Sequence, residues 1–330
     1  METVVQKVPP SVEWRDGRIV LLDQRALPHR VTFTEIEDTE GLVRAIAEMV
    51  VRGAPAIGIA AAYGMAMAHL RGEDMDAARR ALQESRPTAK DLFTAVDRVH
   101  SAWASGEDPV MAARAFAAEI EAACRVIGEI GSELIRDGAR VLTHCNAGAL
   151  ATVYWGTALA PIRVAHLRER APVVLVDETR PRYQGARLTA WELSIEGVSH
   201  VVIADNAAGH LMSRGEVDLV ITGADRIAMN GDTANKIGTY ERAVVAHENG
   251  IPFYVAAPSS TFDPATATGA EFPIEERPEE EVLAWGGSRI APEGTRALNP
   301  AFDVTPAKYI TGFITERGIL DPSDVRSTFG

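Results

Sequence analysis

Five short apolar runs separated by longer segments constrain the fold of this chain more than any other feature. The runs are 139–144 (ARVLTH), 172–178 (PVVLVDE), 200–205 (HVVIAD), 218–225 (DLVITGAD) and 252–258 (PFYVAAP). They are rich in Val and Ile and apolar at successive positions, which is typical of parallel strands covered on both faces. Most intervening segments, such as 148–170, 185–196 and 234–249, are long enough for a crossover helix. The pattern predicts a doubly wound α/β domain with a parallel sheet.

The residues before these runs have a different texture. Residues 11–33 alternate between apolar and polar around Asp16-Gly17, a dipeptide that favours a two-residue hairpin turn. From 38 to 137 the periodicity is helical, and the nearly uncharged stretch 54–70 predicts a buried helix that is too short to span a membrane. We therefore expect a mainly helical N-terminal domain with a small antiparallel sheet over 1–125, followed by a Rossmann-like domain over 126–330.

Composition narrows the class of partner. The formal net charge is −13, and the basic residues form no cluster suited to nucleic acid or to an anionic membrane surface. The two cysteines, Cys124 and Cys145, belong to no CxxC pair, and the N-terminus lacks the apolar core of a secretory signal. These features predict a cytoplasmic protein that acts on a small molecule or binds a protein partner, and that binds neither nucleic acid nor a membrane.

Ligands of open parallel sheets bind beyond the carboxyl ends of the strands, so the residues after each run are the candidates for a site. The chain contains neither the GxGxxG dinucleotide fingerprint nor the GxxxxGK[ST] phosphate loop, which leaves no positive indication of NAD or ATP. Asp177, Glu178, Asp205 and Asp225 are possible metal ligands, but acidic residues after strands are commonly helix caps. We predict neither a metal nor a cofactor.

Cys145 and Asp225 are the ionisable residues best placed for chemistry. A cysteine at a strand end is often an inert small hydrophobe, although His144 and a following helix start would lower its pKa. If Cys145 faces the ligand, the alternation of strand side chains directs His144 into the core. Asp225 follows an apolar strand, where lack of water would raise its pKa and make it an acid. The alternative for Asp225 is an ion pair with Arg226 or a helix cap.

Phosphate binding has separate indications. Arg52, Gly53 and Ala54 precede a helix with Pro55 in its first turn, and free backbone N–H groups there favour an anion. An ordinary helix start with a surface arginine explains the same residues. Asn235 and Lys236 are predicted at another helix start, and the polar connection 177–192 offers Gln184 and Arg187 as further contacts or, alternatively, an exposed turn.

Several stretches together resemble one family. They are MVVRGAPAIGIAAAYG, SRPTA, THCNAGALAT, DETRPRYQGARLTAWEL, DLVITGADRIAMNGDTANKIGTY, PFYVAAPSSTFD, PIEER and NPAFDVTP, in register from about residue 41 to 318. The chain is thereby similar to the S-methyl-5-thioribose-1-phosphate isomerases of methionine salvage, whose superfamily includes the α, β and δ subunits of translation initiation factor 2B. The resemblance implies a homodimer and conversion of 5-methylthioribose 1-phosphate to 5-methylthioribulose 1-phosphate without metal or nucleotide.

The resemblance also implies roles for single residues. Cys145 matches a group that stabilises the transition state and Asp225 matches the proton donor. The matching substrate contacts are Arg52, Gly53, Ala54, Arg86, Gln184, Asn235 and Lys236. Two pairs depart from the family pattern: Lys90-Asp91, where an apolar residue and Asn are expected, and Glu129-Ile130, where His commonly precedes the glycine.

Three alternative functions fit the same pattern, two of them enzymatic. Two are the isomerisation of 5-deoxyribose 1-phosphate and of ribose 1,5-bisphosphate, although a bisphosphate needs a second basic cluster that the sequence does not reveal. A non-catalytic subunit of the initiation factor 2B type is the third alternative, and retention of both Cys145 and Asp225 argues against it.

Overall fold

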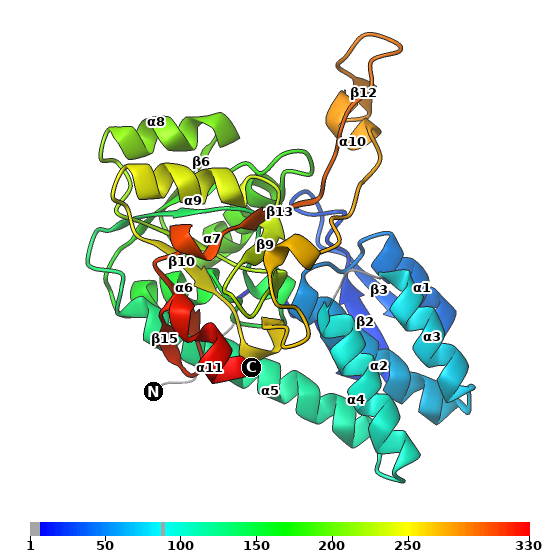
Figure 1. Ribbon diagram of the computed structural model, residues 1–330. Helices are drawn as coiled ribbons and strands as arrows, with labels where there is room; N and C mark the ends of the chain where they lie inside the picture. The colour runs from blue at the N-terminus through cyan, green and yellow to red at the C-terminus, as the bar shows by residue number, and fades with distance from the viewer. Residues whose placement is uncertain (1–6, 87–89) are drawn as a thin grey trace.

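The computed structural model describes residues 7–86 and 90–330 and contains a seven-stranded sheet beside a group of long helices (Figure 1). The sheet order is β15-β14-β10-β7-β4-β5-β6, and every neighbouring pair is parallel except β14 with β15. The bounds are β4 Arg140–Thr143, β5 Val173–Asp177, β6 His200–Ile203, β7 Leu219–Thr222, β10 Phe253–Ala256, β14 Gly312–Thr315 and β15 Gly318–Leu320. All five predicted strands are therefore confirmed.

The sheet is apolar on both faces because each face supports its own core. Val141 packs in one buried cluster with side chains of α5 (Pro109–Ser132), α6 (Leu159–Leu167) and α7 (Ala190–Glu196). The next residue, Leu142, packs in another with α8 (Ala208–Ser213) and α9 (Thr239–Glu248). Successive strand side chains point to opposite faces, so one apolar run supplies both cores.

The order of the strands locates a crevice. From β4 the chain moves outward to β5 and then β6, and it returns to place β7 on the other side of β4. The connections therefore leave β4 and β7 in opposite directions. The carboxyl ends of two such strands flank the crevice in which open parallel sheets bind ligands.

The N-terminal part begins with the predicted hairpin. β1 (Val12–Arg15) and β2 (Arg18–Leu22) pair across a two-residue turn in which Asp16 and Gly17 have φ of 50° and 82°, and β3 (Phe33–Ile36) completes a small antiparallel sheet. The helices are α1 Thr39–Ala47, α2 Ala54–Arg71, α3 Met75–Ser85 and α4 Lys90–Ala104, together with the first turns of α5. The buried Ala-rich helix is confirmed as α2, whose small side chains allow close packing against α4 and α5.

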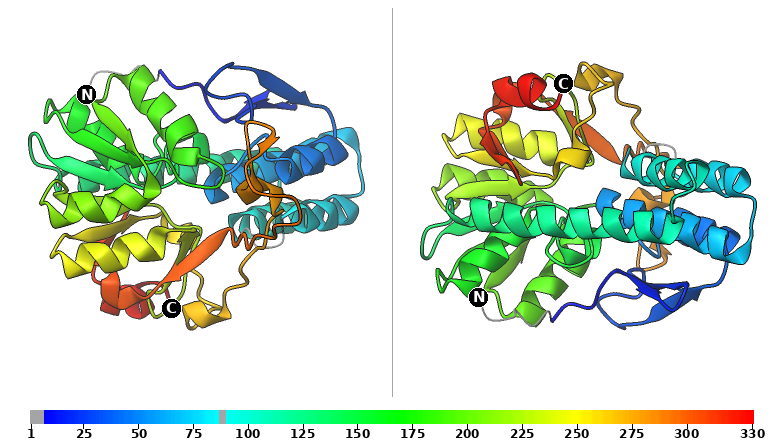
Figure 2. Two further views of the ribbon diagram at one scale, coloured as in Figure 1. Left: turned by 90° about the horizontal axis from the view of Figure 1, so that it is seen from above. Right: turned by 90° about the horizontal axis from the view of Figure 1, so that it is seen from below.

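Helix α5 belongs to both parts of the molecule and runs from one to the other in the views of Figure 2. Its residues from Ala113 to Cys124 pack in the core of the N-terminal helices. Three residues later, Ile127 packs in the core on one face of the sheet. One continuous helix therefore joins the two hydrophobic cores.

Two of the predicted crossover helices differ from the structure. In 148–170 the helix begins only at Leu159, after a single 3-10 turn at Ala149–Ala151. In 234–249, Asn235 and Lys236 do not start a helix; they lie in β9 (Thr233–Lys236), and α9 begins at Thr239. β9 is paired on one side with β8 (Arg226–Ile227) and on the other with β13 (Phe302–Thr305), which lies far away in the chain. That pairing overrides the local helical pattern.

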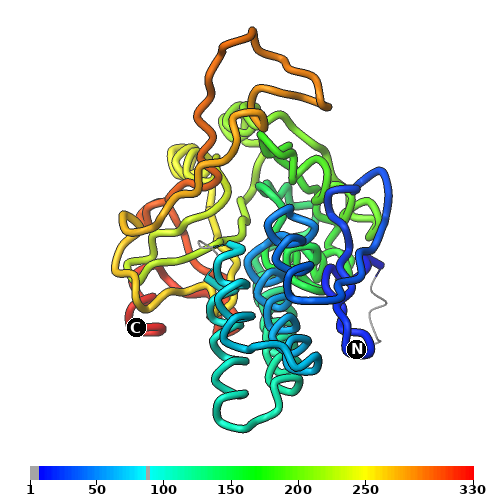
Figure 3. Tube along the Cα trace, turned by 90° about the vertical axis from the view of Figure 1, so that its right-hand side faces the viewer, coloured from blue at the N-terminus to red at the C-terminus, as the bar shows by residue number. Residues whose placement is uncertain are grey.

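A segment between β10 and β13 leaves the body of the protein. α10 (Glu280–Leu283), β11 (Ala284–Trp285) and β12 (Ser288–Arg289) lie on an arm that projects outward (Figure 3). Its base is closed by backbone hydrogen bonds from Arg277 to Asn299 and from Ala301 to Glu275. The chain ends with α11 (Val325–Phe329). Within 7–86 and 90–330, no helix has the length and apolar composition needed to cross a bilayer.

Candidate functional site

A pocket lies beyond the carboxyl ends of β4 and β7, and it collects the residues singled out from the sequence. Its lining includes Arg52, Gly53, Ala54, Arg86, Cys145, Gln184, Asp225, Asn235 and Lys236. Residues far apart in the chain thus lie along one surface. Arg187 does not belong to this lining; its guanidinium donates to the carbonyl oxygens of Arg25 and Leu27. The SRPTA motif is described only at Ser85 and Arg86, since 87–89 lie outside the described residues.

Cys145 is held in an unusual backbone conformation at the end of β4. Its φ is 64°, in the left-handed region that costs a non-glycine residue about 1–2 kcal/mol. Its N–H donates to Thr179 Oγ1 at 2.8 Å, and its carbonyl oxygen accepts from Thr189 Oγ1 at 2.7 Å. Thr189 ends a π-helical turn, Gly185–Thr189, of a kind that often occurs at functional sites. The two threonines fix the cysteine at the pocket.

The thiol of Cys145 is not activated as a nucleophile. Burial raises its pKa above the ordinary value, and this effect outweighs the nearby positive charges of Arg52 and Lys236. The sequence-based expectation that its surroundings would lower the pKa is therefore wrong. At neutral pH the group is a neutral, weakly polar S–H.

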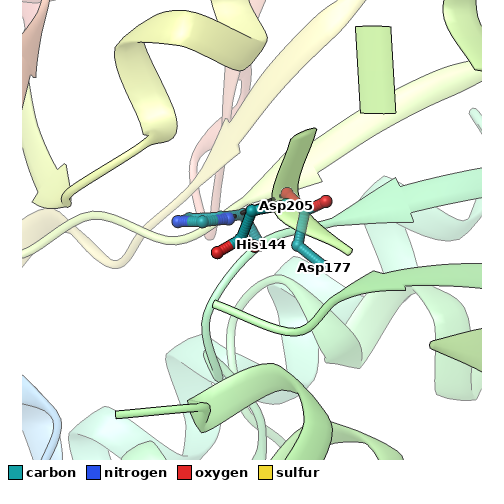
Figure 4. A group of neighbouring side chains, drawn as sticks. All are labelled: His144, Asp177 and Asp205. Atoms are coloured by element: carbon teal, nitrogen blue, oxygen red, sulfur yellow. Dashed lines mark hydrogen bonds and ion pairs between the residues drawn. The ribbon is translucent and has the colours of Figure 1, made fainter. Parts of the chain in front are cut away.

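His144 lies in the core, as the alternation of strand side chains predicts. It is 1% exposed, its Nδ1 lies 2.8 Å from Asp177 Oδ2, and its Nε2 lies 2.8 Å from the Ile237 carbonyl oxygen. His144, Asp177 and Asp205 converge from three strand ends (Figure 4). The cation that this group faces is the guanidinium of Arg242, whose Nε donates to Asp177 Oδ2 at 2.7 Å. The cluster therefore acts as a structural support beneath the cysteine.

Asp225 is half-buried and lies among positively charged groups. Its backbone N–H donates to the Ala234 carbonyl oxygen at 2.9 Å, which fixes it beside β9. Burial raises the pKa of Asp225, although the charges of Lys236, Arg86 and Arg52 oppose the rise. The alternative that it pairs with Arg226 is wrong, because Arg226 Nε donates to Asp263 Oδ2 at 2.9 Å. The direction of the shift agrees with the expectation of a proton-donating carboxyl.

One nitrogen of the Arg52 guanidinium is available to donate a hydrogen bond to a ligand. Its Nε donates to Gln24 Oε1 at 3.0 Å and its Nη1 to the Asn146 carbonyl oxygen at 2.6 Å. Its buried Nη2 has no protein partner in the part of the chain that is described. Gly53 is the N-cap of α2 with φ 93°, and Pro55 occupies the first turn, so the predicted helix start is confirmed. A guanidinium and the free N–H groups of a helix start together favour an anion.

The opposite wall carries a second cation and two amides. Lys236 Nζ donates to the Ala301 carbonyl oxygen at 2.8 Å and lies 4.7 Å from the centre of the Phe302 ring. Burial lowers the pKa of this lysine. Asn235 Nδ2 donates to Thr239 Oγ1 at 3.0 Å, and Gln184 Oε1 is a buried acceptor with no partner within 7–86 and 90–330.

An extension with both polar and apolar lining adjoins these groups. It shares Gly53, Ala54, Arg86 and Asp225 with the main pocket and adds Ile57, Phe272, Pro273 and Ile274. Arg226 also lines it, but the charge of this arginine is balanced by Asp263. The extension can receive an apolar group attached to a polar ligand. Glu129 and Ile130, the second departure from the family pattern, line neither hollow.

Sequence reasoning missed the residue that organises the loop after β4. The fully buried Glu192 accepts hydrogen bonds from the N–H groups of Ala149 and Leu150 and from Asn146 Nδ2, at 2.8, 3.1 and 2.9 Å. It also forms an ion pair with the buried Arg163. The sequence signal for Glu192 was its position as the single acidic residue of the mostly apolar helical segment 188–195. Gln24, which accepts a hydrogen bond from Arg52, showed no such signal in the sequence.

Known proteins resemble the chain over nearly its full length. The model of the initiation factor 2 subunit family matches residues 50–322. A methylthioribose-1-phosphate isomerase from Thermus thermophilus is 52% identical over 307 residues, covering 93% of this chain and 92% of that protein. The enzyme of the same name from Thermotoga maritima is 50% identical over 326 residues, covering 94% and 95%.

Two solved structures have the same fold. The crystal structure of 5-methylthioribose 1-phosphate isomerase from Pyrococcus horikoshii OT3 superposes with a TM-score of 0.90 at 42% identity, covering 98% of this chain and 96% of that one. The structure described as translation initiation factor eIF-2B, subunit delta, from A. fulgidus gives 0.84 at 42% identity, covering 96% and 97%. In sequence and in fold, the chain belongs to the initiation factor 2 subunit family.

Proposed function

We propose that the protein is a sugar-phosphate aldose–ketose isomerase that converts 5-methylthioribose 1-phosphate to 5-methylthioribulose 1-phosphate in methionine salvage. The observation that carries the proposal is the meeting of Cys145 and Asp225 in one pocket with Arg52, Arg86 and Lys236. Relatives about half identical to the chain bear the name of this enzyme. The reaction needs neither a metal nor a nucleotide.

The chemistry requires an acid and a dry pocket. The anomeric oxygen of the substrate carries phosphate, so the ring cannot open to a free aldehyde. The Asp225 carboxyl, whose protonated form is favoured by burial, donates a proton to the ring oxygen as the bond from that oxygen to C1 breaks. Hydrogen moves from C2 to C1, and C2 becomes a ketone as the proton of its hydroxyl passes to the Asp225 carboxylate left by the first step, which restores the acid. Cys145, a neutral thiol, lies beside the reacting carbons and stabilises the transition state.

The cations and amides hold the phosphate and hydroxyl groups. The open Nη2 of Arg52 and the free N–H groups at Gly53 and Ala54 bind the phosphate. Lys236 adds a buried positive charge, while Arg86, Asn235 and Gln184 contact the sugar. Asp225 is therefore surrounded by groups that neutralise the substrate and leave water outside.

The apolar side chains of the extension favour a methylthio group at C5. A second phosphate, as in ribose 1,5-bisphosphate, would meet Ile57, Phe272 and Ile274. The two arginines of the extension are already paired, Arg226 with Asp263 and Arg86 with Glu275. A 5-deoxy sugar fits the extension but fills less of it. We expect kcat/KM to follow the order methylthioribose, deoxyribose and bisphosphate, and a preference for the bisphosphate would contradict this assignment.

A non-catalytic subunit is the alternative favoured by the likeness to the A. fulgidus structure. Such a protein has no need of a raised pKa at Asp225 or of the left-handed backbone at Cys145. These two features support the enzyme.

We further propose a Rossmann-like domain over 126–330, a helical domain over 1–125, a homodimer and a cytoplasmic location. The strand order supports the first, and the passage of α5 between two cores supports the boundary. Val201 and Val202, on the edge strand β6, are 53% and 41% exposed, which supports association with a second copy. Both cysteines are free thiols, as a reducing compartment favours.

The test is an NMR assay of the purified protein with 5-methylthioribose 1-phosphate in deuterated water. Formation of the ketose tests the function, and deuterium at C1 identifies transfer as a proton. Cys145→Ala and Asp225→Asn are each expected to lower kcat by at least about 100-fold while remaining folded. Cys124→Ala is the matched control, because this second cysteine lies in the helical core and outside the pocket. Turnover near wild type in either pocket variant removes that residue from the mechanism.

A further inference from the structure

A second strained residue lies beside Cys145. Thr179 follows β5 with a φ of 62°, and Cys145 follows the neighbouring strand β4 with a φ of 64°. A positive φ is uncommon for any residue with a side chain and is an outlier for a β-branched one such as threonine. The two residues are joined directly, because the Cys145 N–H donates to Thr179 Oγ1 at 2.8 Å. Backbone strain of this kind persists only where the surroundings hold it, and it gathers at functional sites.

The hydroxyl of Thr179 is oriented by its surroundings. Thr179 is fully buried, and its Oγ1 donates to the Asp177 carbonyl oxygen at 3.0 Å. A hydroxyl has one proton and two lone pairs, so the proton is used at Asp177 and a lone pair faces the Cys145 N–H. The backbone of Gly185 closes the space on another side, since a Cβ there would lie 3.0 Å from Thr179 Oγ1. The hydroxyl is therefore held as an acceptor for Cys145.

The backbone of Thr179 is held from a third strand end. Asp205, which follows β6 (Figure 4), accepts from the Thr179 N–H at 2.8 Å with Oδ1 and from the Arg180 N–H at 2.6 Å with Oδ2. Hydrogen bonds to a carboxylate are stronger than those between neutral groups, so two of them on successive N–H groups fix both peptides. Arg242 Nη2 lies 3.5 Å from Asp205 Oδ1 and donates to the Asp205 carbonyl oxygen. The bonds from Asp205 therefore compensate the strain at Thr179.

The direction of the Cys145 side chain depends on the bond from its N–H. A change in φ is a rotation about the N–Cα bond, which moves the Cβ and the thiol relative to the pocket. The Cys145 carbonyl oxygen is bonded separately to Thr189 Oγ1 at 2.7 Å, so Thr179 controls the other side of the residue. Without an acceptor for its N–H, the cysteine can relax toward the extended or right-handed regions that non-glycine residues prefer. The thiol then turns away from its place at the pocket.

We propose that Thr179 is a positioning residue of the isomerase: its hydroxyl keeps Cys145 in the left-handed backbone conformation that places the thiol beside the reacting carbons. Among the described residues that line the pocket, Cys145 is present and Thr179 is not, so Thr179 acts through the cysteine and not on the substrate. An interaction made only in the transition state affects kcat rather than KM. This inference rests on the proposed function, in which the Cys145 thiol stabilises the transition state.

The variant Thr179→Val tests the proposal, because it keeps the β-branched shape and removes the hydroxyl. We expect kcat to fall at least about tenfold while KM changes less than about twofold, since small displacements of reacting groups have large effects on rate. Thr179→Ser restores the hydroxyl and is expected to regain most of kcat. An unchanged kcat in Thr179→Val, or a loss that serine does not restore, overturns the proposal.

Thr222→Val is the matched control. Thr222 ends the strand β7, is fully buried like Thr179, and has a hydroxyl without a hydrogen-bond partner in residues 7–86 and 90–330. Its replacement removes the same group from a neighbouring part of the sheet and leaves the bonds of Cys145 intact. We expect kcat and KM of the wild type in this variant, and an equal loss of kcat in the two valine variants overturns the proposal.

A second measurement does not depend on activity. The sequence contains two cysteines, so labelling the full chain with ¹⁵N-cysteine gives two backbone amide signals in NMR, from Cys145 and Cys124. In Thr179→Val we expect hydrogen exchange at the Cys145 amide to become about tenfold faster, as loss of one hydrogen bond implies. The Cys124 amide, within α5, should keep its rate. An unchanged rate at Cys145, or an equal acceleration at both cysteines through a general loss of stability, overturns the proposal.

Should Thr179→Val not fold, Asp205→Asn provides the same test one step further from the cysteine. It replaces one accepting oxygen by an amide donor, so the left-handed backbone at Thr179 loses part of its support. We expect a smaller fall in kcat and faster exchange at the Cys145 amide, and neither effect appearing overturns the proposal. Faster exchange confined to Cys145 in a protein without isomerase activity supports the positioning of the cysteine and contradicts only the proposed function.

Discussion

Glu192 supports the loop that carries Cys145, and its removal is the most direct test of how the site is built. In Glu192→Ala the N–H groups of Ala149 and Leu150 lose their acceptor, and the buried Arg163 keeps only Glu196 as a carboxylate partner. Removing one member of a buried ion pair typically costs about 3–5 kcal/mol, so we expect a loss of about 4 kcal/mol in the free energy of unfolding. For a chain of 330 residues that corresponds to a fall in Tm of roughly 6 °C.

The assay pairs urea unfolding with kinetics. We expect kcat/KM of Glu192→Ala to fall by about 100-fold at a temperature where the variant is folded, because small displacements of reacting groups have effects of that size. Glu196→Ala is the matched control: it removes a carboxylate that also bonds Arg163 but accepts from no loop N–H. It is expected to cost less stability, because the Glu196 side chain is 16% exposed whereas that of Glu192 is fully buried. If both variants lose equal stability and Glu192→Ala retains activity, Glu192 does not organise the loop.

Three further outcomes are expected. Gly53→Ala places a Cβ 2.6 Å from the Cα of Ala151 at a backbone φ of 93°, so urea unfolding should show a loss of about 1–3 kcal/mol and KM should rise; unchanged values would contradict the close approach. Gln24→Met removes the acceptor for Arg52 Nε and should raise KM about tenfold with little effect on kcat, whereas a fall in kcat alone would contradict a binding role. Asp225→Asn should be more stable than the wild type, and the difference should grow as pH rises above 3.8. In the wild type, burial raises the pKa of this carboxyl, so it ionises less readily in the folded state than in the unfolded state. Urea unfolding across the pH range measures this gain, which should be absent at a pH below both pKa values.

The elements that could be predicted from the sequence are those that depend on the local pattern of apolar and polar residues. Apolar runs with crossover-length gaps predicted β4, β5, β6, β7 and β10, and the rule that ligands bind beyond parallel strand ends selected Cys145 and Asp225. The raised pKa of Asp225 was also predictable, since a carboxyl after an apolar strand loses water. The roles of these residues remain predictions until the variants are measured.

The errors came from interactions between distant segments. Asn235 and Lys236 appeared to start a helix because their strand partners, Asp303 and Phe302 in β13, lie far away in the chain, and no local pattern records that pairing. The pKa of Cys145 was expected to fall, but loss of hydration is stronger here than the attraction of two cations. Glu192 was overlooked because its function depends on which N–H groups the folded loop turns toward it.

The continuity of α5 has a practical consequence for dividing the molecule. The border between its two cores falls within one helix, between Cys124 and Ile127, and not in a linker. A cut there would divide α5, so each fragment would keep only part of the helix and would lose the packing that the other part provides. Such fragments would aggregate, and the intact chain should melt in one calorimetric step. The two parts can be described separately, but we expect them to unfold as one unit.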